Sequence, residues 1–333
     1  MGGEFRKILK VKGISLLSGG LDSIIATKVI QEQGIYVLGV TFETPFFSAR
    51  KAIKSAVHIG LPLSVIDLAE DHLNMVKAPR YGYGKNMNPC IDCHTLMLKK
   101  AGEIMEKENA DFIFTGEVLG QRPMSQNRQS LYTVAKNSGY GEYVVRPLSA
   151  KLLPETKPEM DGKINREKLL DIQGKGRKQQ LALAKHYGIA VYSSPAGGCL
   201  LTDPRFSVRL KDLFAHKQDF TVRDVELLKV GRHFRTADLC KVIVGRNSHD
   251  NETLLHLSHA GDTIIHMANY PGPTVLVQGV CPEETLHIAA SLCAFYSDAP
   301  HDREVLIESR TGNQTNSLKT RAARRELVEH LMV

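Results

Sequence analysis

Short apolar runs alternate with longer amphipathic stretches through roughly the first two hundred residues. Five of the apolar runs have the length of a strand: Lys12–Leu17, Ile35–Phe42, Leu63–Leu68, Asp111–Glu117 and Tyr143–Leu148. The stretches between the first four runs carry helical patterns, as in Asp22–Gln33 and Cys90–Ala110. Strands that alternate with helices of about ten residues or more predict βαβ units. We therefore expect an α/β fold with a doubly wound parallel sheet.

The pattern changes near Arg205. From there, short apolar runs, as in Asp224–Thr236 and Cys240–Leu257, predict short strands separated by turn residues. These turns fall at Gly231, Gly245–Asn247 and Pro271–Pro273. A helical stretch over Pro282–Asp298 and a basic helix or tail at the end of the chain complete this part. The sequence predicts two domains, residues 1–204 with the parallel sheet and residues 205–333 with a smaller α+β fold.

Composition narrows the class of protein. Of the 333 residues, 42% are apolar and 24% are charged, which is typical of globular proteins. No apolar run approaches the roughly 18 residues that cross a membrane, and the first residues lack the pattern of a secretory signal. We expect a cytoplasmic protein without a membrane partner, whose six cysteines are thiols or metal ligands rather than disulfides.

The net charge of +7 is unevenly distributed. Lysine and arginine outnumber the acidic residues only before residue 205, and Arg146–Lys185 holds ten basic residues against five acidic ones. Such a surplus predicts an anionic partner such as RNA. A solvated, lysine-rich helical surface explains the same charge equally well.

The stretch SGGLDS, Ser18–Ser23, directly follows the first predicted strand. Gly19 and Gly20 present no Cβ, so the backbone can approach an anion closely. The next helix then begins with free N–H groups at the positive end of its dipole. Asp22 suits either that helix start or a Mg²⁺ ion. An ordinary tight turn is the alternative to a phosphate cradle.

In this context SGGLDS resembles the pyrophosphate loop of the PP-loop ATPases, which cleave ATP to AMP and pyrophosphate. The resemblance implies that the adenine lies near Thr41 and Phe42, and that the sugar and α-phosphate lie near Gly116 and Glu117. It implies Mg²⁺·ATP as cofactor and a catalytic role for Asp22. The implied nucleotide-binding residues are Ser18, Gly19, Gly20, Asp22, Ser23, Thr41, Phe42, Gly116 and Glu117.

A second motif, NPCIDCH, places two cysteines three residues apart. Asn88 is the expected N-cap and Pro89 the first helical residue, so Cys90 and Cys93 fall on one face of the first turn. A thiol at a helix N-terminus has a lowered pKa. Far along the chain, Cys199 follows two glycines, Gly197 and Gly198, which permit a close approach to another element.

Together these cysteines resemble two kinds of PP-loop enzyme, the tRNA 2-thiouridylases and the iron–sulfur-dependent tRNA thiolation enzymes. The second resemblance implies a [4Fe–4S] cluster held by Cys90, Cys93 and Cys199. The first implies a persulfide relay through Cys93 and Cys199. Zinc, with His94 as fourth ligand, is a third interpretation. The other cysteines lack paired spacing and are expected in the core; they are Cys240, Cys281 and Cys293.

The C-terminal part resembles the RNA-binding domain of NFACT-type proteins, through stretches such as GRHFRT and KVIVGRNSHDNETL. Candidate RNA contacts in the two domains are Arg122, Arg177, Lys178, Arg232, His233, Arg235, Arg246 and Asn247. Phosphate contacts of this kind give affinity without sequence choice. The alternative is that this half braces the catalytic domain or forms a homodimer.

These resemblances imply a tRNA sulfurtransferase that adenylates a uridine carbonyl and replaces the oxygen with sulfur from a hydrosulfide or a persulfide carrier. Two other functions stay open. One is a PP-loop enzyme that thiolates or amidates a small molecule. The other is an RNA-binding quality-control factor with a vestigial ATP site.

Overall fold

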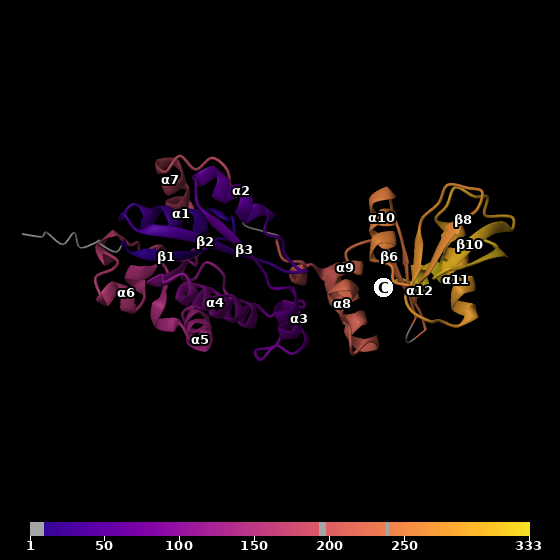
Figure 1. The fold of residues 1–333 in the computed structure, drawn as a ribbon, viewed down its shortest axis with the longest axis horizontal. Helices are drawn as coiled ribbons and strands as arrows, with labels where there is room; N and C mark the ends of the chain where they lie inside the picture. Colours follow the sequence, from indigo (N-terminus) through magenta and orange to yellow (C-terminus); the bar gives the residue numbers. More distant parts are fainter. Residues whose placement is uncertain (1–9, 193–197, 238–239) are drawn as a thin grey trace, which may run out of the picture. The chain divides into compact units, whose positions relative to one another are not determined.

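The computed structural model describes residues 10–192, 198–237 and 240–333. The chain forms two compact units, Met1–Thr202 and Asp203–Val333 (Figure 1). The first unit and the second unit each contain one sheet with its own buried core. Among the described residues, no helix has the length and apolar character to cross a membrane.

The first unit contains a parallel sheet of five strands in the order β3-β2-β1-β4-β5. Its strands are β1 (Lys12–Leu16), β2 (Tyr36–Glu43), β3 (Leu63–Asp67), β4 (Phe112–Thr115) and β5 (Val144–Val145). Its α-helices are α1 (Leu21–Gln31), α2 (Arg50–Ile59), α3 (Ala69–Lys77), α4 (Cys90–Lys107), α5 (Arg128–Ser138), α6 (Lys157–Met160) and α7 (Lys178–His186). The predicted α/β class with a parallel sheet is confirmed.

Helices cover both faces of this sheet. Helices α1, α2 and α7 lie on one side, and α4 and α5 lie on the other (Figure 1). Phe112 and Phe114 of β4 face the first layer, whereas Ile14 of β1 and Ile113 of β4 face the second. The strand order reverses direction at β1, and ligands of such sheets bind at the carboxyl ends beside that point. The glycine turn follows β1 at this edge.

The second unit contains a six-stranded sheet in the order β11-β10-β8-β9-β7-β6, antiparallel at every pairing described. Its strands are β6 (Arg232–Ala237), β7 (Cys240–Val244), β8 (Thr263–Met267), β9 (Val275–Val277), β10 (Val305–Thr311) and β11 (Gln314–Thr320). Its helices are α8 (Pro204–His216), α9 (Val222–Leu227), α10 (Ser248–Leu257), α11 (Glu283–Phe295) and α12 (Arg325–Leu331). The expected small α+β fold is confirmed.

Two stretches of the second unit that sequence patterns assigned to strands are helical instead. Helix α9 begins with a capping box in which Thr221 and Asp224 satisfy each other's backbone N–H groups. Asn247 is the N-cap of helix α10, and its side chain accepts a hydrogen bond from the Asp250 N–H at 2.9 Å. These caps, rather than the short apolar runs, determine the local structure.

Candidate active site

The glycine turn between β1 and α1 lies against the first turn of α2. Gly19 has a φ of +76°, and a Cβ there would lie 2.4 Å from the carbonyl carbon of Lys51. Gly20 is the N-cap of α1, and no described side chain caps this helix. The Ser18 hydroxyl donates to the Ser23 hydroxyl at 3.3 Å. The N–H groups that begin α1 are therefore left for an anion.

The end of β4 packs equally closely on the start of α1. A Cβ at Gly116 would lie 2.4 Å from the backbone nitrogen of Ser23. Beside it, Gln121 Nε2 donates to Asp22 Oδ2 at 2.9 Å. The remaining oxygens of this pair, Asp22 Oδ1 and Gln121 Oε1, are buried without a partner among the described residues. Two such oxygens are suitable ligands for a hard cation like Mg²⁺.

The other residues expected around the nucleotide are already engaged by the protein. Thr41 and Phe42 are buried, and the Phe42 ring belongs to the core, so a ligand could reach only its backbone. The Glu117 carboxylate accepts from Arg146 Nε at 2.9 Å and bonds His94 Nδ1 at 3.0 Å. Burial would raise the pKa of Glu117, but Arg146 and His94 lower it to about 2. Glu117 is thus a buried anion that ties β4 to α4.

The three candidate sulfur ligands lie within electrostatic reach of one another. Cys90 and Cys93 lie in the first turn of α4, and Cys199 approaches from a segment about a hundred residues later. Burial raises the pKa of the Cys93 thiol well above its ordinary value, and the charges of Cys199, Cys90 and Asp92 raise it further. Burial likewise raises the pKa of Cys199 to about 11. These electrostatic effects link Cys93 to both other thiols, and link Cys199 to Cys90.

Two expectations about the start of α4 are wrong. The pKa of Cys93 is raised rather than lowered, because burial and neighbouring negative charge outweigh the helix dipole. The N-cap is Pro89 rather than Asn88, and helix α4 begins at Cys90. The Asn88 side chain instead donates from Nδ2 to Cys90 Sγ at 3.2 Å.

Two hydrogen bonds hold the segment that carries Cys199. The Leu200 N–H donates to the Phe46 carbonyl at 2.9 Å, which attaches the segment to the loop after β2. Asn86 Nδ2 donates to the Thr202 carbonyl at 2.7 Å, which attaches it to the loop before α4. Both loops thus bring Cys199 to the cysteines of α4.

Lys51 lies between the two motifs. Its backbone touches Gly19, and its Nζ lies 3.7 Å from the position that a Cβ of Gly198 would occupy. Gly197, the other glycine before Cys199, falls outside the described residues. The glycine turn and the cysteine segment therefore share one neighbour on α2.

His72 of α3 is a site residue that the sequence analysis missed. Its Nε2 lies 3.2 Å from Cys93 Sγ. The imidazole is fully buried, and its ring centroid lies 5.4 Å from those of both Phe46 and Phe47. Burial lowers the pKa of His72 to about 4, so the ring is neutral at neutral pH. Only tertiary contacts reveal that His72 belongs to the site, and the same is true of Lys51, Asn86 and Arg146.

In the part of the chain that the structure describes, no three His, Cys, Asp or Glu side chains stand where they would hold a metal ion. The donor chemistry of Cys90, Cys93 and Cys199 still suits iron, since thiolates hold iron–sulfur clusters. His94, the fourth ligand in the zinc interpretation, uses its Nδ1 to bond Glu117.

The candidate RNA contacts differ in availability. In the first unit, Arg122 and Lys178 are exposed, and Arg177 is half-buried. In the second unit, Arg235 forms a two-point ion pair with Asp212 at 3.0 and 2.7 Å. Arg246 bonds Asp250 at 2.6 Å.

The guanidinium of Arg232 lies 4.4 Å from the centroid of the Tyr296 ring. His233 is fully buried, and the side chain of Asn247 caps α10. The basic and polar side chains expected at RNA in the second unit therefore all have contacts within that unit.

The remaining cysteines lie in the second unit. Cys240 and Cys293 are buried, as expected of core residues. Cys281 is half-buried, and burial together with a hydrogen bond to the Cys240 thiol raises the pKa of Cys281 to about 12. The sequence spacing did not indicate this thiol pair.

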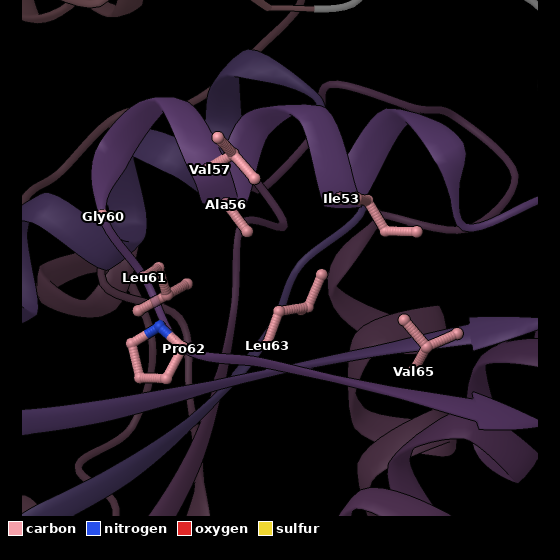
Figure 2. Close-up of a pocket in the computed structure, with 8 residues that line it drawn as sticks. All are labelled: Ile53, Ala56, Val57, Gly60, Leu61, Pro62, Leu63 and Val65. Carbon is pink, nitrogen blue, oxygen red and sulfur yellow. The ribbon is translucent and has the colours of Figure 1, made fainter.

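A hollow of about 540 Å³ lies between the outer face of α2 and the edge strand β3 (Figure 2). Its lining is formed by Ile53, Ala56, Val57, Gly60, Leu61, Pro62, Leu63 and Val65. These residues offer no group for acid–base, nucleophilic or metal chemistry. The candidate active site is the carboxyl edge of the sheet instead.

Each unit matches one known family. Residues 9–151 match the family described as Thiamine biosynthesis protein (ThiI), and residues 231–332 match the NFACT protein RNA binding domain. These matches confirm the two resemblances drawn from the sequence. Cys199 and helices α8 and α9 lie outside both matched ranges.

Individual proteins are similar over part of the chain. The chain is 30% identical over 161 residues to the tRNA-specific 2-thiouridylase MnmA of Syntrophotalea carbinolica, covering 40% of this chain and 45% of that protein. It is 26% identical over 147 residues to the tRNA-specific 2-thiouridylase MnmA 2 of Fusobacterium nucleatum, covering 39% and 42%. The chain thus spans less than half the length of these curated relatives. A solved 4-thiouridine synthetase in complex with RNA and ATP gives a TM-score of 0.31 at 19% identity, covering 54% of either chain.

Proposed function

We propose that this protein is an ATP-dependent tRNA-thiolating enzyme. In this reaction a uridine carbonyl oxygen attacks the α-phosphate of ATP, pyrophosphate leaves, and a sulfur nucleophile then displaces AMP from the base. The observation that carries the proposal is the convergence of two motifs: the glycine turn and the Cys199 segment share Lys51, while Cys199 raises the pKa of Cys93. The similarity of the first unit to thiolating proteins supports it.

The glycine turn would orient the leaving pyrophosphate. The uncapped start of α1, with Gly19, Gly20 and the hydroxyls of Ser18 and Ser23, offers fixed donors to the phosphates. Asp22 would hold Mg²⁺ through Oδ1, which has no hydrogen-bond partner in the part of the chain that the structure describes. These groups act by positioning, because a phosphoryl leaving group needs orientation and charge stabilisation.

The adenine would lie against the backbone at the end of β2, near Thr41 and Phe42. The sugar and α-phosphate would lie near Gly116, whose lack of a side chain keeps β4 close to α1. Glu117 would shape this wall through its ion pair rather than touch the nucleotide.

Cys90, Cys93 and Cys199 would hold a [4Fe–4S] cluster; the influence of Cys199 and Cys90 on the pKa of Cys93, and the hydrogen bonds that hold the Cys199 segment, support this ligand set. Such a cluster, bound by three thiolates, supplies an iron position where a sulfur nucleophile can bind. A persulfide relay between Cys93 and Cys199 is the second candidate for sulfur delivery, and the influence of Cys199 on the pKa of Cys93 favours it over zinc. The sulfur donor would be a hydrosulfide or a persulfide carrier.

The tRNA would bind both units. The exposed Arg122 and Lys178, with Arg177, would contact phosphates near the sheet edge. The match of residues 231–332 to an RNA-binding domain supports a second contact. Because Arg235 and Arg246 are paired with acids inside the second unit, a contact there through Arg232 has better support.

The proposal is tested with the full chain, purified anaerobically and given Mg²⁺·ATP, tRNA and sulfide. We expect AMP and pyrophosphate to form, together with a thiolated nucleoside detected by mass spectrometry. Cys199→Ala should abolish the thiolated nucleoside, whereas Cys293→Ala, which alters a buried thiol of the second unit, should not. If the native protein shows the visible absorption band of an iron–sulfur cluster and the single variant Cys90→Ala loses it, the cluster is favoured over the relay.

Either of two results would refute the proposal and favour another function. ATP turnover that depends on a small carbonyl compound and not on tRNA would indicate a small-molecule enzyme. RNA binding with no AMP formation under any condition would indicate a binding protein with a vestigial ATP site.

A further inference from the structure

Two stretches of the first unit contain basic residues and no acidic ones, residues 72–91 and residues 118–141. Five exposed cations belong to them, and in the described part of the chain none of the five forms an ion pair. These cations are Arg80, Lys85, Arg122, Arg128 and Lys136. Since no acid of either stretch competes for them, they are suited to an anionic partner.

A hydrogen bond joins the two stretches. Asn137 Nδ2 of α5 donates to the Tyr81 hydroxyl at 2.8 Å. The N–H groups of Arg80 and Tyr81 donate to the Asp92 carboxylate at 3.1 and 3.0 Å, which fixes this loop to the first turn of α4. Residues 78–89 and helix α5 thus form one surface, and it adjoins the helix turn that carries two of the candidate sulfur ligands.

Exposed aromatic rings accompany the cations of this surface. Tyr81 is 45% exposed and Tyr132 of α5 is 61% exposed. The Arg80 guanidinium lies 5.6 Å from the centroid of the Tyr81 ring, and Lys136 Nζ lies 6.0 Å from that of Tyr132. Unpaired bases stack on aromatic side chains, and nearby cations contact their phosphates. Each tyrosine with its cation therefore matches the two parts of one nucleotide.

We propose that the surface formed by residues 78–89 and α5 binds unpaired nucleotides of RNA, with bases on Tyr81 and Tyr132 and phosphates on the neighbouring cations. Duplex RNA fits less well, because its bases stack on one another and offer no free face to a tyrosine. An acidic peptide matches the cations alone, whereas a nucleotide matches both the cations and the rings. The inference rests on the proposed function only in taking this RNA to be the tRNA substrate.

The position of the surface gives the binding a purpose. Gln121 of the second stretch bonds Asp22 of the glycine turn, and Asp92 lies between Cys90 and Cys93 in the sequence. Both stretches therefore reach the candidate active site. Enzymes that react with a base take it out of its stack. Unpaired nucleotides held on this surface would keep the strand beside the reacting uridine open.

The location is tested by ultraviolet cross-linking of the full chain to an oligouridylate, followed by mass spectrometry of the tryptic peptides. Tyr81, Tyr132 and a control, Tyr36, fall on three different peptides. Tyr36 is 44% exposed and has Lys12 Nζ 5.9 Å from its ring centroid, but it begins β2, and Glu108 pairs with that lysine at 2.8 Å. We expect uridine adducts on the peptides of Tyr81 and Tyr132 and none on that of Tyr36. Adducts confined to other peptides, or spread equally over all three, would overturn the proposal.

The strength of the contact is measured by fluorescence anisotropy of a labelled oligouridylate bound to the full chain. Tyr132→Ala should weaken binding about tenfold, as expected for the loss of one base stack, whereas Tyr132→Phe and Tyr36→Ala should bind like the native chain. Lys136→Gln should reduce the slope of log affinity against log salt by about 0.7. A blunt RNA duplex should bind the tyrosine variants and the native chain alike. Native affinity for oligouridylate in both Tyr81→Ala and Tyr132→Ala would overturn the proposal and leave a protein as the partner of this surface.

Failure of the two proposals can be told apart, because RNA binding is measured without ATP. If no thiolated nucleoside forms but oligouridylate binding depends on Tyr81 and Tyr132, the proposed function fails and the RNA surface stands. If tRNA is thiolated and the tyrosine variants keep both the native RNA affinity and the native KM for tRNA, the RNA surface fails alone.

Discussion

A methyl group added at Gly19 should damage nucleotide binding more than the same change at another glycine of the same conformation. Gly19 and Gly34 have φ values of +76° and +77°, and they stand at opposite ends of α1. A Cβ at Gly34 would meet no atom of the described residues within 4 Å, whereas one at Gly19 would meet the backbone of α2. Gly34→Ala is therefore a matched control for Gly19→Ala.

The magnitudes follow from these two environments. An alanine held in the left-handed region costs about 1–2 kcal/mol at either position. At Gly19 the Cβ would also lie 2.4 Å from the Lys51 carbonyl and 2.6 Å from the Ala52 nitrogen, where ordinary contact begins at 3.4 Å. The turn or α2 must then shift by about 1 Å, and such overpacking adds about 1–3 kcal/mol. That shift moves the start of α1 away from its phosphate-binding position.

The assay combines urea unfolding followed by circular dichroism with calorimetric titration of Mg²⁺·ATP. We expect Gly34→Ala to lose about 1–2 kcal/mol of stability and to bind ATP like the native chain. Gly19→Ala should lose more stability and bind ATP at least tenfold more weakly, a change of about 1.4 kcal/mol. Equal ATP affinity in the two variants would refute the role of the turn as a phosphate cradle.

Three further predictions concern stability and the cysteine segment. Burial would raise the pKa of Asp212, but its bonds to two basic side chains lower that pKa to about 2. The charged carboxylate therefore stabilises the second unit fully above its unfolded pKa of about 3.9. This stabilisation disappears as the pH falls toward 2. Hydrogen exchange of second-unit peptides should show that the free energy of unfolding of this unit falls by about 2 kcal/mol over that pH range. In Asp212→Asn this dependence on pH should be much smaller. Arg146→Met leaves the buried Glu117 carboxylate without its arginine and should lower the free energy of unfolding in urea by about 3–5 kcal/mol. The double variant with Glu117→Gln should recover most of that stability. Asn86→Ala should cost about 1 kcal/mol and raise hydrogen exchange around Thr202, and unchanged exchange there would show that this bond does not hold the segment.

Local patterns in the sequence determined most of the first unit. Alternation of apolar strands with amphipathic helices specifies a parallel sheet, because each element buries its own face and the spacing permits only crossover connections. The glycine turn and the spacing of Cys90 and Cys93 can also be recognised locally, because each is specified by a few adjacent residues.

The tertiary structure decided what those residues can do. The N-terminus of α4 predicts a lowered pKa for Cys93, yet burial and the charge of Cys199 raise it. Glu117 looked like a ligand-facing residue at a strand end, and Arg146 makes it a buried ion pair instead.

His72 shows the same limit most clearly. Nothing within its own helix relates His72 to Cys93, twenty-one residues away, yet in the folded chain His72 Nε2 lies 3.2 Å from Cys93 Sγ. Periodicity and capping act within one or two turns of chain, so they can be recognised in the sequence. Burial and through-space charge depend on which distant segments pack together, and only the folded chain determines that.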